Sequence, residues 1–139
     1  MLKVKDLLNQ KQSNLWCIHP KASILDALKI MSYRDIGALP VMDEMGLVGI
    51  ISERDFVHVI AKSHRCEIDE TIDHYMTKEV MTVTPESSLE ECMLMMAKKH
   101  IRHLPVIDKN ELVGLISIGD VMRAIVAEKD FTIQDKNKR

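Results

Sequence analysis

Apolar residues in the first part of the chain recur at helical spacing and then gather into two strand-length runs. Ser23 and Asp26 form an S-x-x-D helix start, and the apolar residues around it fall at i, i+3, i+4 and i+7. This spacing predicts a capped amphipathic helix. The apolar runs 38–42 and 47–51 follow, joined by the turn residues 43–46, and they predict a β-hairpin.

Further elements flank this helix and hairpin. A second capped helix is predicted to start at Ser52, with Phe56 on its inward face. A short strand is predicted at residues 16–18, and a short leading helix at residues 4–8. The unit therefore reads β-α-β-β-α, introduced by a leading helix.

The same series of elements occurs twice, 65 residues apart and without a gap. The matched positions include Pro20/Pro85, Leu39-Pro40-Val41/Leu104-Pro105-Val106, Leu47-Val48-Gly49/Leu112-Val113-Gly114 and Asp55/Asp120. An ungapped repeat of this length predicts two copies of one supersecondary unit. We expect an α/β (α+β) fold, with one unit and its leading helix at 1–65, a second unit and its leading helix at 66–130, and a disordered polar tail at 131–139.

Size and composition narrow the possible classes of protein. The chain has 139 residues, 46% of them hydrophobic, and a net charge of −2. Such a charge gives no general attraction to nucleic acid or to anionic lipid. The sequence has no apolar run of transmembrane length and no signal peptide at its start, so a cytoplasmic protein with no membrane or nucleic-acid partner is expected.

Cysteine and histidine spacing favours neither a disulfide framework nor a metal site. The three cysteines, Cys17, Cys66 and Cys92, are an odd number at irregular intervals. Neither a CxxC nor an HxxxH pair occurs, so no metal ligands are predicted. A redox role for Cys17 or Cys66 has no support in the sequence beyond the thiols themselves.

The best candidates for ligand-binding residues lie where the second strand of each predicted hairpin ends. Gly49-Ile-Ile-Ser52-Glu-Arg-Asp55 and its copy Gly114-Leu-Ile-Ser117-Ile-Gly-Asp120 run from a buried strand into a helix N-terminus. Such a terminus suits a phosphate, and an aspartate one turn in can accept hydrogen bonds from two sugar hydroxyls. The same S-x-x-D pattern is also an ordinary capping box, so spacing alone leaves both interpretations open.

The tandem unit closely resembles a CBS domain pair, also called a Bateman module. The resemblance lies in the h-P-V-x-D hairpins at 39–43 and 104–108 and in the two G-h-h-S-x-x-D exits, over about residues 1–130. The phrases GIISERDF and IRHLPVIDKNELVGLISIGD look like stand-alone members of that family from bacteria and plant organelles. The resemblance implies two units packed about a pseudo-twofold axis, with adenosyl ligands bound in two clefts between them.

The resemblance also implies which residues line each cleft. The family's ribose aspartate falls on Asp55 and Asp120, and its serine or threonine on Ser52 and Ser117. The first cleft is expected to contain Ser52, Arg54, Asp55, Val80, Met81, Ile101, Arg102 and His103. The second is expected to contain Leu15, Trp16, Ile36, Gly37, Ala38, Ser117 and Asp120.

These features favour a regulatory module over an enzyme. The resemblance implies that AMP, ADP or ATP, with NADH and S-adenosylmethionine as further candidates, binds as an effector and that occupancy is passed to a separate partner protein. No cofactor is required, and the sequence lacks a nucleophile motif, a phosphate-binding GKS/T loop and a metal set. Apolar residues on more than one side of the closing helices predict a homodimer, the alternative being that they meet across the pseudo-twofold axis within one chain. The alternative is a ligand-independent homodimeric adaptor whose serines only cap helices.

Differences between the repeats predict unequal clefts. Arg102 and His103 stand where the first repeat has small residues, and Arg54 stands where the second repeat has a glycine. If the three side chains converge on Asp55, that cleft gains cationic donors for phosphate. We then expect it to prefer phosphorylated ligands and the cleft of Asp120 to tolerate uncharged ones. The alternative is that these are solvated surface charges.

Overall fold

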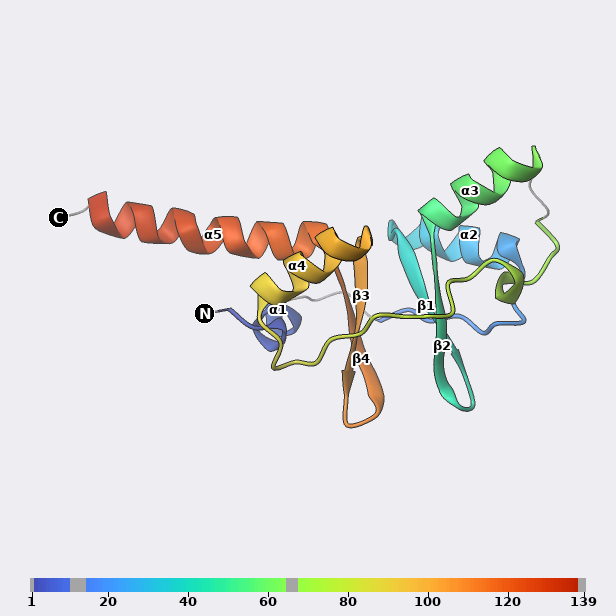
Figure 1. The fold of residues 1–139 in the computed structure, drawn as a ribbon, viewed down its shortest axis with the longest axis horizontal. Coiled ribbons are helices and arrows are strands. Elements are labelled where there is room, and N and C mark those ends of the chain that lie inside the picture. Colours follow the sequence, from blue (N-terminus) through green and yellow to red (C-terminus); the bar gives the residue numbers. More distant parts are fainter. Residues whose placement is uncertain (1, 11–14, 65–67, 138–139) are drawn as a thin grey trace. The chain divides into compact units, whose positions relative to one another are not determined.

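The chain folds into two hairpin-and-helix units built from equivalent elements (Figure 1). The computed structural model describes residues 2–10, 15–64 and 68–137, with side chains described as far as residue 129. In chain order the elements are α1 (Val4–Gln10), α2 (Ile24–Arg34), β1 (Ala38–Asp43), β2 (Gly46–Ser52), α3 (Glu53–Ser63), η1 (Ile72–His74), α4 (Leu89–Lys99), β3 (His103–Asp108), β4 (Glu111–Ser117) and α5 (Ile118–Asn137). The α/β class and the tandem order predicted from the repeat are confirmed.

The helices α2 and α4 begin and end in the same way. Ser23 and Ser88 each accept a hydrogen bond from the backbone N–H three residues on, at 3.0 and 3.1 Å. Both helices end at a left-handed residue, Asp35 with φ 52° and His100 with φ 55°. The serine hydroxyls satisfy N–H groups that the first helical turn would otherwise leave unpaired.

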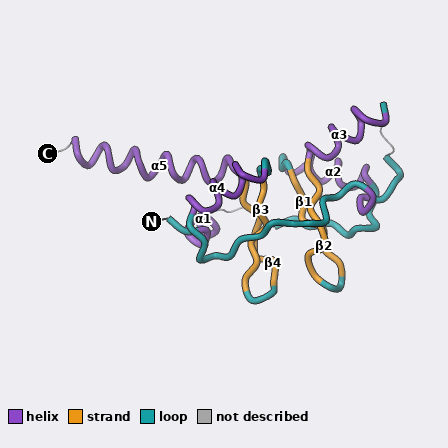
Figure 2. Tube along the Cα trace, in the orientation of Figure 1, coloured by secondary structure: helices purple, strands orange, loops and turns teal. Residues whose placement is uncertain are grey.

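Each helix pair is accompanied by a two-stranded antiparallel hairpin (Figure 2). Pro40 lies opposite Ile50, and Ile50 directs both its N–H and its C=O to Thr77, at 3.0 and 2.9 Å. The pair Pro40–Ile50 therefore needs no donor from the proline. The second hairpin repeats this register, with Pro105 opposite Leu115.

The strands predicted just before Pro20 and Pro85 are reduced to single bridges. Ile18 pairs with Val41, and Val83 pairs with Val106, each in parallel fashion. The N–H of Ile18 donates to the carbonyl of Pro40 at 3.0 Å. These segments extend each hairpin by one bridge, since the chain then turns into the helix that follows Pro20 or Pro85.

The compact units do not follow the boundaries of the sequence repeat. One unit is Leu15–Val80, and the other joins Met1–Asn14 to Met81–Arg139. The division expected from the repeat, at 1–65 and 66–130, therefore differs in where the leading segments belong. The physical reason is hydrogen bonding: the N–H of Val4 donates to the carbonyl of Ser87, and that of Ile24 to the carbonyl of Glu70. Each leading segment thus packs in the unit formed by the other repeat.

Each unit has its own aliphatic core. In the unit 15–80 the buried residues include Ile24, Leu39, Ile51 and Ile72. In the other unit they are the counterparts Leu89, Leu104 and Ile116, together with Val4 from α1. The leading segments contribute a fully buried residue to each core, which explains why they belong to these units. It stays a prediction that the two units pack about a pseudo-twofold axis.

Two glycines mark where the leading segments lie against the hairpins. A Cβ at Gly49 would lie 2.6 Å from the sulfur of Met76 and 2.9 Å from the carbonyl oxygen of Thr77. A Cβ at Gly114 would lie 2.5 Å from a methyl group of Leu8. Close approach of a leading segment therefore requires glycine on β2, where backbone blocks a side chain, whereas on β4 a Cβ would meet only the flexible end of Leu8.

The last helix is longer than the sequence predicted. The tail 131–139 was expected to be disordered, but α5 continues through Asn137, and residues 138 and 139 lie outside the described residues. The chain has neither glycine nor proline between Asp120 and Asn137 to stop the helix. Within the described ranges, no helix combines the length and apolar character needed to cross a membrane.

Candidate functional site

The two S-x-x-D sequences stand at equivalent places, where a hairpin strand runs into the closing helix. Ser52 ends β2 and precedes α3, and Ser117 ends β4 and precedes α5. Asp55 and Asp120 lie in the first turn of these helices, and both are half-buried. The fold therefore holds each carboxylate close to the end of a rigid hairpin.

At the start of α3, Ser52 binds the carboxylate of Asp55 twice. Its backbone N–H donates to Oδ2 of Asp55 at 2.8 Å, and its hydroxyl donates to the same oxygen at 3.1 Å. The hydroxyl of Thr77, from the leading segment of the same unit, approaches Oδ1 at 3.5 Å. One carboxylate oxygen is thus held firmly, while the other has a long contact.

At the start of α5 the equivalent residues form a reciprocal cap. The N–H of Ser117 donates to Oδ2 of Asp120 at 2.9 Å, and the N–H of Asp120 donates to the Ser117 hydroxyl at 3.1 Å. The guanidinium of Arg123 donates to Oδ1 of Asp120 at 2.9 Å. The Asp120 side chain is 17% exposed and that of Arg123 75%. A Cβ at Gly119 would lie 3.1 Å from the same guanidinium.

The first backbone N–H group of each closing helix is already used. That of Glu53 donates to the carbonyl of Gly37 at 3.0 Å, and that of Ile118 donates to the carbonyl of Arg102 at 2.8 Å. These two amides are therefore not available to a phosphate. A phosphate at either helix start would depend on later amides and on nearby side chains.

The structure distributes each predicted cleft over both compact units. The unit 15–80 holds Ser52, Arg54, Asp55 and Val80 of the first cleft and Leu15, Trp16, Ile36, Gly37 and Ala38 of the second. The other unit holds Met81, Ile101, Arg102 and His103 of the first cleft and Ser117 and Asp120 of the second. It stays a prediction that the two halves of each cleft meet.

Within a unit, the hairpin brings together residues that were assigned to different clefts. Ala38 pairs with Ser52 across β1 and β2, and His103 pairs with Ser117 across β3 and β4. The residues before each h-P-V step therefore border the serine of their own repeat. This adjacency follows directly from antiparallel pairing, because the start of one strand lies opposite the end of the next.

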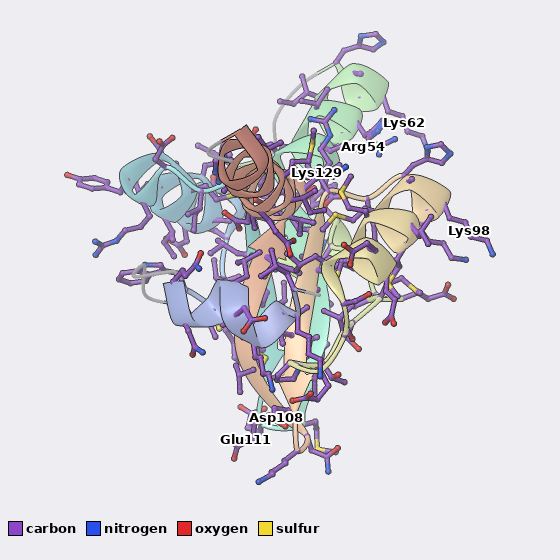
Figure 3. All side chains as sticks on the ribbon, turned by 90° about the vertical axis from the view of Figure 1, so that its left-hand side faces the viewer. Arg54, Lys62, Lys98, Asp108, Glu111 and Lys129 are labelled. Carbon is purple, nitrogen blue, oxygen red and sulfur yellow. The ribbon has the colours of Figure 1, made fainter. Side chains whose placement is uncertain are left out.

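Several predicted cleft residues make contacts within their own unit. Trp16 is half-buried, and the guanidinium of Arg34 lies 3.9 Å from the centre of its ring, within cation–π range. Arg54 extends from the first turn of α3 (Figure 3), where its Nε donates to Nε2 of His58 at 3.3 Å. Arg102 is exposed, and His103 is half-buried.

The structure adds residues that the sequence prediction missed. A shallow groove of about 270 Å³ runs between α1 and α5 beside Asp120, and it is lined by Leu7, Gln10, Asp120, Arg123, Ala124 and Ala127. Arg123 could have been found from the sequence, because it lies three residues after Asp120 on one helix face. Thr77 and the residues of α1 could not, since their positions depend on the exchange of leading segments.

The cysteines do not add chemistry to this site. Cys17 is exposed as a residue, but its thiol is partly shielded from water, and this desolvation raises the pKa of the thiol. Cys92 is buried, and burial raises the pKa of its thiol to about 11. A raised pKa lowers the thiolate fraction, and thiolate is the reactive form. Cys66 lies outside the described residues, and the described part of the chain contains no group of three His, Cys, Asp or Glu residues placed to hold a metal ion.

The arrangement suits the binding of a vicinal diol. A ribose presents two adjacent hydroxyl donors, and an ionised carboxylate can accept both. Ser52 and Ser117 fix the orientation of each carboxylate, because their backbone N–H groups donate to its Oδ2. The two carboxylates stand at equivalent positions of the repeat, and Oδ1 of Asp120 already accepts a hydrogen bond from Arg123.

Comparison with known proteins identifies the repeated unit. The family model for the CBS domain matches residues 4–62 and 72–127. The chain is 38% identical over 128 residues to CBSX3, a mitochondrial CBS domain-containing protein of Arabidopsis thaliana, and the match covers 88% of this chain and 62% of that protein. The chain thus spans less than two thirds of the length of this relative. A CBS-domain protein of Burkholderia ambifaria has a TM-score of 0.85 and 34% identity, with 90% of this chain and 94% of that chain covered.

Two further solved structures contain adenosyl compounds. The CBS domain pair of MJ0100, solved with 5-methylthioadenosine and S-adenosyl-L-methionine, has a TM-score of 0.80 and 29% identity, covering 92% of this chain and 98% of that one. CBSX2, solved with AMP, has a TM-score of 0.76 and 25% identity, covering 91% and 98%. On the match of both repeats, this chain belongs to the CBS domain family and carries two CBS domains.

Proposed function

We propose that the chain is a sensor of adenosyl ligands, which binds AMP, ADP or ATP, or alternatively NADH or S-adenosylmethionine, and reports occupancy to a partner protein. The observation that carries the proposal is the pair of serine-oriented carboxylates, Asp55 and Asp120, at equivalent positions of both repeats. The ligands in the structures of MJ0100 and CBSX2 support the choice of an adenosyl group. The ligand acts as an effector, and the proposal assigns the chain no catalytic step and no cofactor.

Occupancy can reach the surface through α3 and α5. Each aspartate lies in the first turn of a closing helix, and these helices carry exposed apolar residues, among them Val57 at 63% and Met122 at 49% exposure. A ligand can shift an equilibrium only if it binds two arrangements with different affinity. We therefore infer that the signal is a change in the position of these helices, read by a separate regulated protein.

A second candidate function is a ligand-independent homodimeric adaptor. The reciprocal cap between Ser117 and Asp120 favours it, because a capping box needs no ligand to explain it. The exposed apolar residues of α3 and α5 would then serve dimer formation alone. The two candidates differ in one respect: only the sensor gains stability from a nucleotide.

Melting experiments with added ligands distinguish these candidates. At a hundredfold excess over its Kd, a ligand should add about 2.7 kcal/mol of stability, which raises the melting temperature by several degrees. Asp55→Ala and Asp120→Ala should each remove part of this gain, and 2′-deoxy ligands should give a smaller one. No shift with AMP, ADP, ATP, NADH or S-adenosylmethionine at millimolar concentration would favour the adaptor.

Asp26→Ala provides a matched control for the two aspartate variants. Asp26 forms the same kind of capping box with Ser23, at 3.0 and 3.3 Å, but at the start of α2. Its loss should lower the melting temperature of the free protein and leave the ligand-induced shift intact. An equal loss of the shift in Asp26→Ala would mean that the aspartates act through stability rather than through ligand contact.

A further inference from the structure

The two aspartates have different cationic neighbours, although the repeat makes their positions equivalent. The residue before Asp55 is Arg54, and its counterpart before Asp120 is Gly119. One turn further along, the first repeat has His58 and the second has Arg123. In the first repeat an arginine therefore precedes the aspartate by one residue, and in the second an arginine follows the aspartate by three residues.

This exchange gives Asp120 an internal counter-ion. Arg123 donates to Oδ1 of Asp120 at 2.9 Å, while Oδ2 accepts from the N–H of Ser117. The guanidinium also lies close to Gly119, where a Cβ would be 3.1 Å from Nη1. Glycine at this position leaves room for Arg123 to fold back over the first turn of α5.

Asp55 has a different arrangement. Its Oδ1 is approached by the Thr77 hydroxyl at 3.5 Å, and Arg54 bonds to His58 at 3.3 Å. A contact of 3.5 Å is at the limit of hydrogen bonding and is weak. A ribose diol can therefore bind Oδ1 of Asp55 without displacing an ion pair.

We propose that Arg123 makes the site of Asp120 selective for anionic adenosyl ligands, a step that rests on the proposed function. A diol that binds both oxygens of Asp120 displaces the guanidinium from Oδ1. A phosphate on the same ligand offers the displaced guanidinium a new partner, and an uncharged nucleoside offers none. Arginine suits this role, because its planar fork matches both carboxylate and phosphate oxygens.

The exposure of Arg123 makes such a movement inexpensive. Its side chain is 75% exposed, and ion pairs of this kind are weak in water. The groove between α1 and α5 lies beside the pair and contains both Asp120 and Arg123 in its lining. This selectivity is the reverse of the one that the repeat alignment predicts for the cleft of Asp120, because the alignment takes no account of Arg123.

The test compares AMP with adenosine at the site of Asp120 alone. In an Asp55→Ala background, calorimetry should show that Arg123→Met raises adenosine affinity about two- to fivefold, since no ion pair has to be broken. The same variant should lower AMP affinity about tenfold or more, since the phosphate loses a charged donor. The two ligands thus respond in opposite directions, which a structural effect on the site would not produce.

Two further variants separate the charge of Arg123 from its position. Gly119→Ala should push the guanidinium away from Asp120 and raise adenosine affinity without loss of AMP affinity. Lys129→Met removes an exposed charge further along α5 (Figure 3) and should change neither affinity. Parallel changes for AMP and adenosine in Arg123→Met would overturn the inference. Failure of the unsubstituted chain to bind either ligand would overturn the proposed function as well.

Discussion

At the scale of single residues, one serine motif has two uses in this chain. Ser23, Ser88 and Ser117 each accept a hydrogen bond from a backbone N–H in the first helical turn. Ser52 instead donates its hydroxyl to Oδ2 of Asp55. The capping interpretation of the motif therefore fits the start of α5 better than the start of α3.

This difference predicts unequal effects on stability from the same substitution. Ser117→Ala removes a backbone cap and should lower the free energy of unfolding by about 1 kcal/mol. Ser52→Ala removes a contact to a side chain and should lower it less. Urea unfolding of the two variants measures this directly. A larger loss for Ser52→Ala would contradict the assignment of the two hydroxyls.

The site could be predicted from the sequence only in part. The positions of Ser52, Asp55, Ser117 and Asp120 follow from local patterns, because a strand exit and a helix cap depend on neighbouring residues. The i, i+3 spacing places Arg123 near Asp120, but the ion pair itself depends on the rotamer of a long side chain, which a pattern does not specify. Repeat alignment therefore located the carboxylates and missed the charge that covers one of them.

At the scale of elements, the leading segments connect the two repeats. Thr77 bridges to Ile50 on β2, and α1 places Leu8 against Gly114 on β4. Helices and hairpins were predictable, because their signals lie within short windows of sequence. The exchange of leading segments was not, because both repeats offer similar apolar surfaces and only tertiary packing selects between them.

Glycine substitutions test this packing of the leading segments. Gly49→Ala brings a Cβ within 2.9 Å of the Thr77 carbonyl oxygen, a backbone atom that cannot move alone. Gly114→Ala meets only the flexible side chain of Leu8. We expect Gly49→Ala to lower the free energy of unfolding by about 1–3 kcal/mol and Gly114→Ala by less. Equal losses in chemical unfolding would contradict the different contacts of the two glycines.

An ion pair fixes the second leading segment near α2. The ammonium of Lys21 donates to Asp73 at 2.8 Å, and the hydroxyl of Thr71 also donates to this carboxylate. These bonds, that of Lys21 first, lower the pKa of Asp73 to about 2, from an ordinary value of 3.8. The stability that this shift contributes is present above about pH 4 and is lost as the pH falls toward 2.

Asp73→Asn should therefore lower the free energy of unfolding near neutral pH. In strong acid, where Asp73 is protonated, the substitution should have little effect on it. Unfolding measured between pH 7 and pH 2 should show the variant and the unsubstituted protein approaching each other as the pH falls. Asp69→Asn, at an exposed position nearby, controls for the change in net charge. A constant difference across this pH range would show that Asp73 acts through its shape rather than through its charge.

At the scale of the whole molecule, α3 and α5 leave apolar surface uncovered. Val57 and Met122 occupy equivalent positions of the repeat and are 63% and 49% exposed. A helix with apolar residues on more than one side favours a second partner. We therefore expect a homodimer, with light scattering giving about twice the mass of one chain at micromolar concentration.

Substitutions on these helices test the dimer. Val57→Asp combined with Met122→Asp should reduce the mass to that of one chain, since a buried carboxylate opposes association. Leu94→Asp changes another strongly exposed residue, on α4, and should leave the mass unchanged. A single-chain mass for the unsubstituted protein would refute the dimer and would leave the ligand proposal in place.

Calorimetric titration with AMP tests the central claim, that each CBS repeat supplies one carboxylate to an adenosyl site. The unsubstituted chain should bind two molecules of AMP per chain, Asp55→Ala and Asp120→Ala one each, and the double variant none. Each aspartate holds its ligand through charge-assisted hydrogen bonds of about 1.5–3 kcal/mol, so its loss should be clearly measurable. Unchanged binding of AMP by the double variant would contradict the account.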